Sequence, residues 1–178
     1  MLNMDKFKNT AAAQTAPQPA PAAASTNALE GLGSAQVFEK GIQFETGTYV
    51  ATIDVVKLFP SRQKSADIFV VEFIVKETIN GAAQPGERRS WVQQINKVGD
   101  VKQRPMALSA IKGFVMAAVN PKTPADKAAV ADNAQEIILA AVSDSQDLKG
   151  YEVRVASSPI PPKKPGDLAY QRENFTGV

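Results

Sequence analysis

The sequence contains no cysteine and no histidine among its 178 residues. Thiolate and imidazole groups build most zinc sites, cysteine nucleophiles and Ser-His-Asp triads, so these kinds of site are excluded. A disulfide framework is excluded for the same reason. No phosphate-binding P-loop and no calcium-loop pattern occurs in the chain. We therefore expect a protein that binds its partner without catalysis and without a metal or other cofactor.

Long apolar runs are also missing. The most apolar stretch, Met106 to Val119, is too short to span a bilayer and contains Lys112. The first residues, MLNMDKFKNTAAAQTA, include no apolar run of the kind found in signal peptides. We therefore expect a soluble protein that is neither associated with a membrane nor exported.

Large side chains are scarce near the start of the chain. Residues 10–36, TAAAQTAPQPAPAAASTNALEGLGSAQ, consist mainly of small and polar residues and of proline, which cannot bury enough apolar surface to offset the entropy of ordering. We predict a disordered low-complexity arm over residues 1–36 and one folded domain over residues 37–178. An arm of this kind either stays free or contacts a neighbouring subunit or partner.

Three stretches that follow are typical of β-strands. Thr48 to Leu58 alternates between apolar and polar residues, and it predicts a half-buried strand with four side chains on its inner face: Tyr49, Ala51, Ile53 and Val55. Ile68 to Glu77 is a nearly continuous β-branched and aromatic run, which indicates a strand covered on both faces, with Phe69 and Phe73 in the core. Arg88 to Asn96 follows an Asn-Gly and a Pro-Gly pair, so the three strands form an antiparallel meander.

The pattern then changes to helical spacing. Pro105 suits the first turn of a helix, and apolar residues follow at intervals of three and four: Leu108, Ile111, Val115 and Ala118. A second helical stretch, Pro124 to Val142, has Thr123 as its expected cap and breaks near residues 131–133. Two more strands are expected, one over Tyr151 to Ser157 and a short one within LAYQRENF.

This order of elements predicts a fold. Three meandering strands, a helical insertion and two further strands match the OB-fold, a five-stranded antiparallel barrel with one or two helices between strands three and four. The fold class is therefore mainly β with a helical insertion (α+β). Other small β-barrels, and a β-sandwich with a helical insertion, share the same order and stay open as alternatives.

Several segments also resemble a known family. FETGTYVATIDVV, FVVEFIV, AIKGFVMAA and LKGYEVRV, together with a glycine before the tryptophan strand, are similar in order and composition to the single-stranded DNA-binding proteins of tailed bacteriophages, which have an OB core. The resemblance covers residues 41–157. Many members carry an acidic C-terminal tail that recruits partners, whereas the residues AYQRENFTGV contain no acidic run.

The resemblance implies a function. A protein of this family coats single-stranded DNA without sequence preference during phage DNA replication and recombination, in the cytoplasm of the bacterial host. The implied partners are single-stranded DNA and phage replication proteins. Whether the protein forms a homo-oligomer, and whether it prefers DNA to RNA, stays open.

Basic residues support the same expectation. Residues 37–115 contain eleven Lys and Arg against eight Asp and Glu, whereas residues 116–178 contain seven against eight. The excess gathers in KLFPSRQK and around the third strand, where cations replace counterions on phosphates and rings stack on bases. The predicted nucleic-acid-binding residues are Phe59, Arg62, Lys64, Arg88, Arg89, Trp91, Gln93, Lys97, Lys102 and Arg104.

The only tryptophan lies in the third predicted strand. Alternation places Trp91 on the same face as Arg89 and Gln93, a combination that suits a wet groove in which stacking and hydrogen bonding are both available. Ile95 extends that face, so a tryptophan in the core is the alternative. Phe59 is the second candidate for stacking, because it precedes Pro60 in a polar region.

Two other classes of function compete with this prediction. A virion structural protein, such as a head-decoration or tail component, would also combine a β-barrel with an extended arm, and would show an apolar patch and a fixed oligomer. A small enzyme that uses carboxylates would depend on Asp54 and Glu72 as inward-facing acids, whereas the simpler interpretation of Glu72 is an exposed edge position or a pair with a basic neighbour. Without a histidine, a cysteine or a catalytic motif, we do not expect an enzyme.

Overall fold

A computed structural model describes residues 42–61, 66–96, 102–161 and 170–178. The chain divides into two units, Met1–Lys40 and Gly41–Val178, and the fold belongs to the second. The predicted arm therefore lies outside the described residues, as do the connections that carry Arg62, Lys64 and Lys97.

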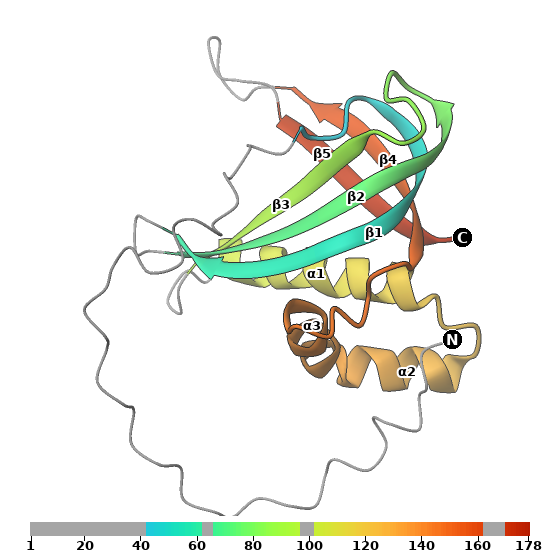
Figure 1. The fold of residues 1–178 in the computed structure, drawn as a ribbon. Coiled ribbons are helices and arrows are strands. Elements are labelled where there is room, and N and C mark those ends of the chain that lie inside the picture. The colour runs from blue at the N-terminus through green and yellow to red at the C-terminus, as the bar shows by residue number, and fades with distance from the viewer. Residues whose placement is uncertain (1–41, 62–65, 97–101, 162–169) are drawn as a thin grey trace, which may run out of the picture. The chain divides into compact units, whose positions relative to one another are not determined.

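Five strands form one antiparallel sheet in the order β3-β2-β1-β4-β5 (Figure 1). The strands are β1 (Gly47–Pro60), β2 (Ala66–Asn80), β3 (Arg88–Asn96), β4 (Glu152–Ile160) and β5 (Tyr170–Gly177). Strands β1, β2 and β3 form the predicted meander, and β4 pairs with the first half of β1. Because each neighbour is antiparallel, the two edge strands β3 and β5 run in the same direction along the sheet.

The first strand follows its predicted alternation only as far as Ile53. Tyr49, Ala51 and Ile53 are buried as expected, but the register with β2 shifts between Ile53 and Val55. A bulge of this kind adds one residue and reverses which side chains face inward. Val56 is therefore buried and Val55 only half-buried, so the prediction for Val55 is wrong.

The second strand is buried mainly on one face. Phe69 and Phe73 are fully buried, which confirms that both belong to the core. Glu72 and Ile74 on the opposite face are half-buried, so the expectation of a strand covered on both faces holds only near Val70.

Three helices separate β3 from β4, and Figure 1 shows them on one side of the sheet. They are α1 (Gln103–Val119), α2 (Pro124–Asp132) and α3 (Ala134–Val142). The Thr123 side chain accepts a hydrogen bond from the backbone N–H of Asp126, which confirms the predicted cap. The break between α2 and α3 falls at Asn133, as predicted. Of the four apolar residues at helical spacing, Ile111, Val115 and Ala118 are buried, whereas Leu108 is exposed because α1 buries the adjacent Ala107 in its place.

Aromatic rings fill the space between α1 and the sheet. The Phe114 ring of α1 lies 6.2 Å from the rings of Phe69 and Phe73 and 5.4 Å from that of Phe175, measured between ring centroids. Rings of this size supply most of the area buried in a small core. The core therefore joins α1 to β2 and to β5 at once.

The sheet curls until its two edges approach each other. The ring centroids of Trp91 in β3 and Phe175 in β5 lie 4.8 Å apart, although three strands separate them in the sheet order. Among the described residues, no ladder of backbone hydrogen bonds joins β3 to β5. The sheet is thus open, and the predicted closed barrel is not formed.

The start of the folded unit covers part of the free edge of β3. The Ser90 N–H donates to the carbonyl of Ile42 at 2.9 Å, and Gln43 forms a parallel bridge with Ser90. Phe44 follows directly, with its ring 5.4 Å from Tyr49 and 5.5 Å from Phe73 between centroids. This short segment is therefore anchored in the core.

None of the described helices is long and apolar enough to cross a membrane.

Candidate functional site

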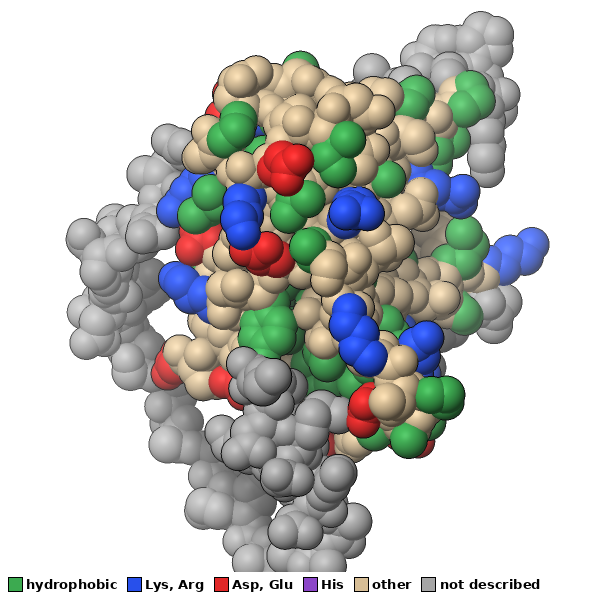
Figure 2. All heavy atoms as spheres, turned by 90° about the vertical axis from the view of Figure 1, so that its right-hand side faces the viewer, with side chains coloured by type: hydrophobic (Ala, Val, Ile, Leu, Met, Phe, Trp, Pro, Cys, Tyr) green, Lys and Arg blue, Asp and Glu red, His purple; other side chains and the backbone are tan. Residues whose placement is uncertain are grey.

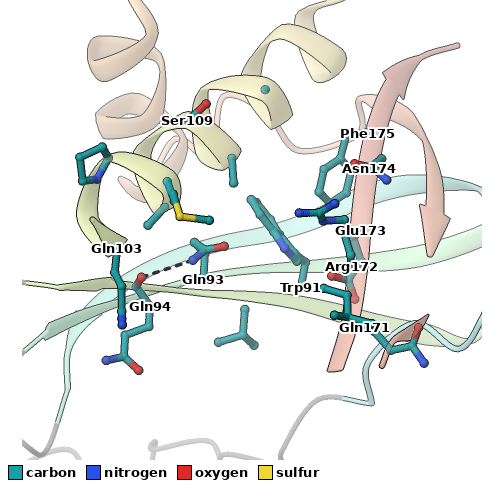
Figure 3. A pocket seen from close by; sticks show the side chains of 17 residues that line it. Trp91, Gln93, Gln94, Gln103, Ser109, Gln171, Arg172, Glu173, Asn174 and Phe175 are labelled. Carbon is teal, nitrogen blue, oxygen red and sulfur yellow. Dashed lines mark hydrogen bonds between the residues drawn. The ribbon is translucent and has the colours of Figure 1, made fainter. Parts of the chain in front are cut away.

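A groove with a volume of about 920 Å³ lies between the two edge strands and α1 (Figure 3). Strand β3 contributes Trp91 to Gln94, β5 contributes Gln171 to Phe175, and Ile160 of β4 completes that side. Helix α1 contributes residues between Gln103 and Gly113. The groove follows from the open sheet, because β3 and β5 approach each other without pairing and α1 spans the gap.

Trp91 belongs to the core and borders the groove. Its side chain is 5% exposed, and its ring lies 5.9 Å from Phe69 and 5.6 Å from Phe114 between centroids. The predicted alternation in β3 is correct, but the face that carries Trp91 turns toward the helix instead of toward solvent. A free face on which a base could stack is therefore not available on this ring, and the prediction of an exposed platform is wrong.

Arg89 is buried on the same inward face. Its guanidinium pairs with Glu87 at 2.6 Å and donates to the carbonyl of Arg88 at 3.0 Å. The side chain is 7% exposed, and its Nε has no hydrogen-bond partner among the described residues. The prediction that Arg89 contacts phosphate is wrong, because its charge is already paired and lies inside the fold.

Amide side chains form much of the polar lining of the groove. Gln93 is half-buried, and Figure 3 shows it beside Gln94 on β3, with Gln103 of α1 close by. Gln171 and Asn174 come from β5 on the other side. Each amide offers both donors and acceptors, so this lining can hydrogen-bond the edges of many polar planar groups.

Two of the described lining residues carry ionisable side chains, and both lie in β5. Arg172 is exposed, whereas Glu173 is half-buried in the inward row that contains Gln171 and Phe175. Burial raises the pKa of Glu173 above the usual range of a glutamate, and a hydrogen bond with its own backbone acts in the opposite direction. Glu173 takes part in none of the ion pairs between described residues.

The start of α1 adds positive charge at one end of the groove. Lys102 occupies the cap position, its side chain makes no capping hydrogen bond, and the first turn contains no acidic residue. Arg104 donates from Nη1 to the carbonyl of Asn96 at 2.7 Å, which holds the guanidinium against the end of β3. Free backbone N–H groups and the helix dipole favour an anion at such a terminus.

The outward face of β1, β2 and β3 carries charges that are already paired. Arg88 lies 3.1 Å from Asp54 and 3.9 Å from Glu72, while Lys57 lies 2.6 Å from Glu72 and Lys149 lies 3.3 Å from Asp54. Figure 2 shows basic and acidic side chains interspersed over one face of the molecule. Arg88 is exposed as predicted for a phosphate ligand, but two carboxylates share its charge.

The same ion pairs bear on the rival prediction of an enzyme. Asp54 and Glu72 lie on the outward face, not inside, and each is bound to cations. The pairing of Glu72 with basic neighbours confirms the simpler interpretation of this residue. The inward position that an enzyme would need is not observed, because the inner positions of β1 and β2 are taken by apolar residues such as Ile53 and Phe73.

Phe59, the remaining described residue of the predicted set, lies at one end of the sheet. Pro60 pairs with Asp67, and Ala66 pairs with Asn96, so β1 ends, β2 begins and β3 ends at the same edge, next to the start of α1. Phe59 is half-buried in β1 at this end. The structure thus places Gln93 in the groove and Arg104 at the adjoining end of β3, whereas Arg88 lies at the other end of that strand on the outward face.

Sequence reasoning missed the contribution of β5. Arg172, Glu173 and Phe175 all line the groove, and none was among the predicted site residues. Strict alternation in YQRENF would have placed Glu173 on the same face as Phe175, which marks an acid on an otherwise inward row. The approach of β5 to β3 depends on the curl of the whole sheet, which no local pattern encodes.

Comparison of the sequence with models of known protein families gave no match, and comparison with curated proteins found no similar chain.

Proposed function

We propose that the protein binds single-stranded DNA in the groove between β3 and β5. The observation that carries the proposal is a groove lined by amide groups and by the edges of Trp91 and Phe175, which reaches the start of α1 at Gln103. Single-strand binders need cations for the phosphates and polar or aromatic contacts for the bases. The groove offers base contacts along its length and cations at its ends.

In this proposal, the start of α1 and Arg172 bind the phosphates of the strand. Lys102 and Arg104 flank Gln103 in the chain, and Gln103 lines the groove. Arg172 lines it from β5 and is exposed. A strand that passes between these points would meet positive charge on both sides of the amide lining.

A single strand fits this arrangement better than a duplex. In a duplex the Watson–Crick edges are paired and the bases are stacked inside, so the amides of the groove would reach only phosphates and groove edges. In a single strand the same edges are free to accept and donate hydrogen bonds. Preference for single strands is therefore a direct consequence of an amide-lined groove.

The proposal includes an open form of the OB-fold. Its support is the sheet order, the helices inserted between β3 and β4, and the close approach of β3 and β5. The family resemblance of residues 41–157 adds a role in coating single strands during phage DNA replication and recombination. The phage origin and the host cytoplasm as location belong to this proposal.

The test is binding of a labelled oligothymidine of about fifteen nucleotides, close to the upper site size of one OB domain. We expect binding that weakens steeply with salt, because counterions are released from the phosphates, and we expect a change in Trp91 emission, because the ring borders the groove. A labelled duplex of the same length should bind more weakly.

A charge reversal locates the site. Arg172→Glu should weaken binding, whereas Arg154→Glu, on an exposed position of β4 outside the groove, should not. The proposal fails if the protein does not bind oligothymidine at low salt, if it binds the duplex equally well, or if the two reversals have the same effect.

One observation favours the rival role as a virion structural protein. Three apolar side chains at the groove are exposed: Val92 by 44%, Met106 by 68% and Ile160 by 37%. Apolar rims of this kind also suit protein docking. That role predicts a fixed oligomer in solution, no affinity for single strands, and loss of assembly in Met106→Glu.

A further inference from the structure

Glu173 is a carboxylate in a position that strands usually reserve for apolar residues. In the register of β4 with β5 it lies opposite Ser157, which is buried, and Phe175 on the same inward row lies opposite Val155, which is fully buried. Glu173 also lines the groove. Its carboxylate therefore faces the inner side of the sheet, where the edge strands β3 and β5 approach each other.

No cation neutralises this carboxylate within the described part of the chain. Arg172 is its neighbour in β5, but adjacent residues of a strand point to opposite faces, and the two side chains form no ion pair. The other described lining residues with polar side chains are amides and Ser109. A half-buried carboxylate that no cation neutralises is costly, so its presence beside a groove indicates a ligand that supplies hydrogen-bond donors.

The four DNA bases differ in the donors that they offer. Guanine presents two adjacent donors, N1–H and the 2-amino group, in the spacing that a carboxylate accepts with both oxygens. Cytosine and adenine present one amino group next to an acceptor nitrogen. Thymine presents one N–H between two carbonyl oxygens, which repel a carboxylate.

We propose that Glu173 gives the groove a preference for guanine at one position of the bound single strand, with the carboxylate accepting from N1–H and from the 2-amino group. This inference rests on the proposed function and goes beyond it, because a general single-strand binder needs no base preference. Phosphate contacts and hydrogen bonds from the amides hold the strand, and Glu173 selects among the bases that reach it.

The burial of Glu173 is consistent with this role. The pKa of the carboxylate is raised by desolvation, which means that its ionised form is under-solvated before a ligand arrives. Two donors from guanine would replace the lost water and stabilise the ionised form. A good bidentate contact to a base changes affinity by on the order of tenfold relative to a base that cannot make it.

A structural role is the competing explanation. Inward-pointing charges on edge strands prevent edge-to-edge pairing, so Glu173 would keep β5 from joining another strand. In that case its removal would promote self-association and would leave the relative affinities for different bases unchanged.

The experiment compares oligothymidines that carry one central guanine, one central hypoxanthine or no substitution. Hypoxanthine keeps N1–H and lacks the 2-amino group, so it removes one of the two proposed donors. We expect the guanine oligonucleotide to bind on the order of tenfold more tightly than plain oligothymidine, with hypoxanthine between them. Glu173→Gln should bind plain oligothymidine at least as tightly as the wild type and should lose the preference for guanine.

Two further variants keep the result interpretable. Glu173→Asp retains the charge on a shorter side chain and should reduce the preference without abolishing it. Glu136→Gln, on an exposed position of α3, removes a charge elsewhere and should leave the preference intact. Circular dichroism and gel filtration monitor the folding and the oligomeric state of each variant.

The outcomes separate the two proposals. Equal affinity for all three oligonucleotides, or a guanine preference that survives in Glu173→Gln, overturns the role of Glu173 and leaves single-strand binding in place. Absence of binding to plain oligothymidine overturns both. Self-association of Glu173→Gln with unchanged base preference assigns Glu173 to protection of the edge.

Discussion

The outward face of β1, β2 and β3 and the groove between β3 and β5 use charge in opposite ways. On the outward face, Arg88 and Lys57 are bound to Asp54 and Glu72, so the cations are already neutralised. In the groove, Arg172 and Glu173 form no ion pair with any described residue. The density of basic residues along the sequence favoured the outward face as the binding site. The absence of ion-pair partners among the described residues favours the groove.

The difference shows why counting charges does not locate a ligand site. An exposed ion pair contributes about 0 to 1 kcal/mol, and it also removes most of the field that would attract a phosphate. A charged side chain that forms no ion pair, and that lies beside amide groups and ring edges, remains available to bind a ligand. The predictions below test whether the two regions differ in this way.

The largest effect is expected from Trp91, whose ring lies in the core and borders the groove. Trp91→Ala should reduce the free energy of unfolding by about 3 to 5 kcal/mol, because it leaves a cavity among Phe69, Phe114 and Phe175. Denaturant unfolding measures the change. Met106→Ala, on an exposed groove position, is the control and should stay within about 0.5 kcal/mol. A small loss in Trp91→Ala would show that the ring is a surface group after all.

A smaller effect, on the affinity for oligothymidine, distinguishes the groove from the outward face as the binding site. Arg172→Ala should weaken binding of oligothymidine by about tenfold, which corresponds to the loss of one charge-assisted hydrogen bond. Arg88→Ala should change the affinity by less than about twofold, because its charge is already shared with two carboxylates. Fluorescence anisotropy at one fixed salt concentration measures both. The reverse order of effects would place the strand on the outward face.

A pH-dependent gain in stability is expected from Glu173→Gln. The folded protein holds the Glu173 proton more tightly than the unfolded chain does, because burial raises the pKa. The group therefore costs no stability at pH values below its unfolded pKa, and the cost grows as the pH rises through the raised folded pKa. Glu173→Gln should raise the melting temperature at neutral pH and leave it unchanged in acid, and thermal unfolding at the two pH values measures the difference.

The smallest effect concerns the stability of the outward face. Arg88→Ala removes contacts to Asp54 and Glu72, but the Arg88 side chain is 69% exposed, so solvent screens the interaction. We expect a loss of less than about 1 kcal/mol in unfolding free energy, and a smaller loss at high salt. A loss that is larger than this, or insensitive to salt, would show that the pair acts as a buried network.

Much of the fold could be predicted from local chemistry. The cap at Thr123 and the bounds of β3 depend on a few neighbouring residues, and both were predicted correctly. The bulge after Ile53 was not predicted, because nothing in an alternating stretch such as TIDVV fixes where an extra residue enters. The exposure of Leu108 was not predicted, because apolar residues on α1 occupy more than one face and only packing decides which of them are buried.

The site could be predicted less well than the fold. Alternation correctly placed Arg89, Trp91 and Gln93 on one face of β3, but it does not indicate which face lies under a helix. The groove exists because β3 and β5 come together through the curl of five strands, and α1 then spans them. Residues such as Glu173, distant in the sequence from the predicted site, become neighbours only in that arrangement.

The short bridge at the start of the domain gives the groove a direction. The backbone of Ile42 and Gln43 occupies the edge of β3 at Ser90, whereas the edge from Trp91 to Gln94 borders the groove. At about 3.3 Å per residue, this leaves on the order of 10 Å of strand edge before the chain's own backbone is reached. A polymer that follows β3 from the α1 end therefore runs into a stop and has to turn away from the sheet, so the protein would leave a short footprint with distinct entry and exit sides.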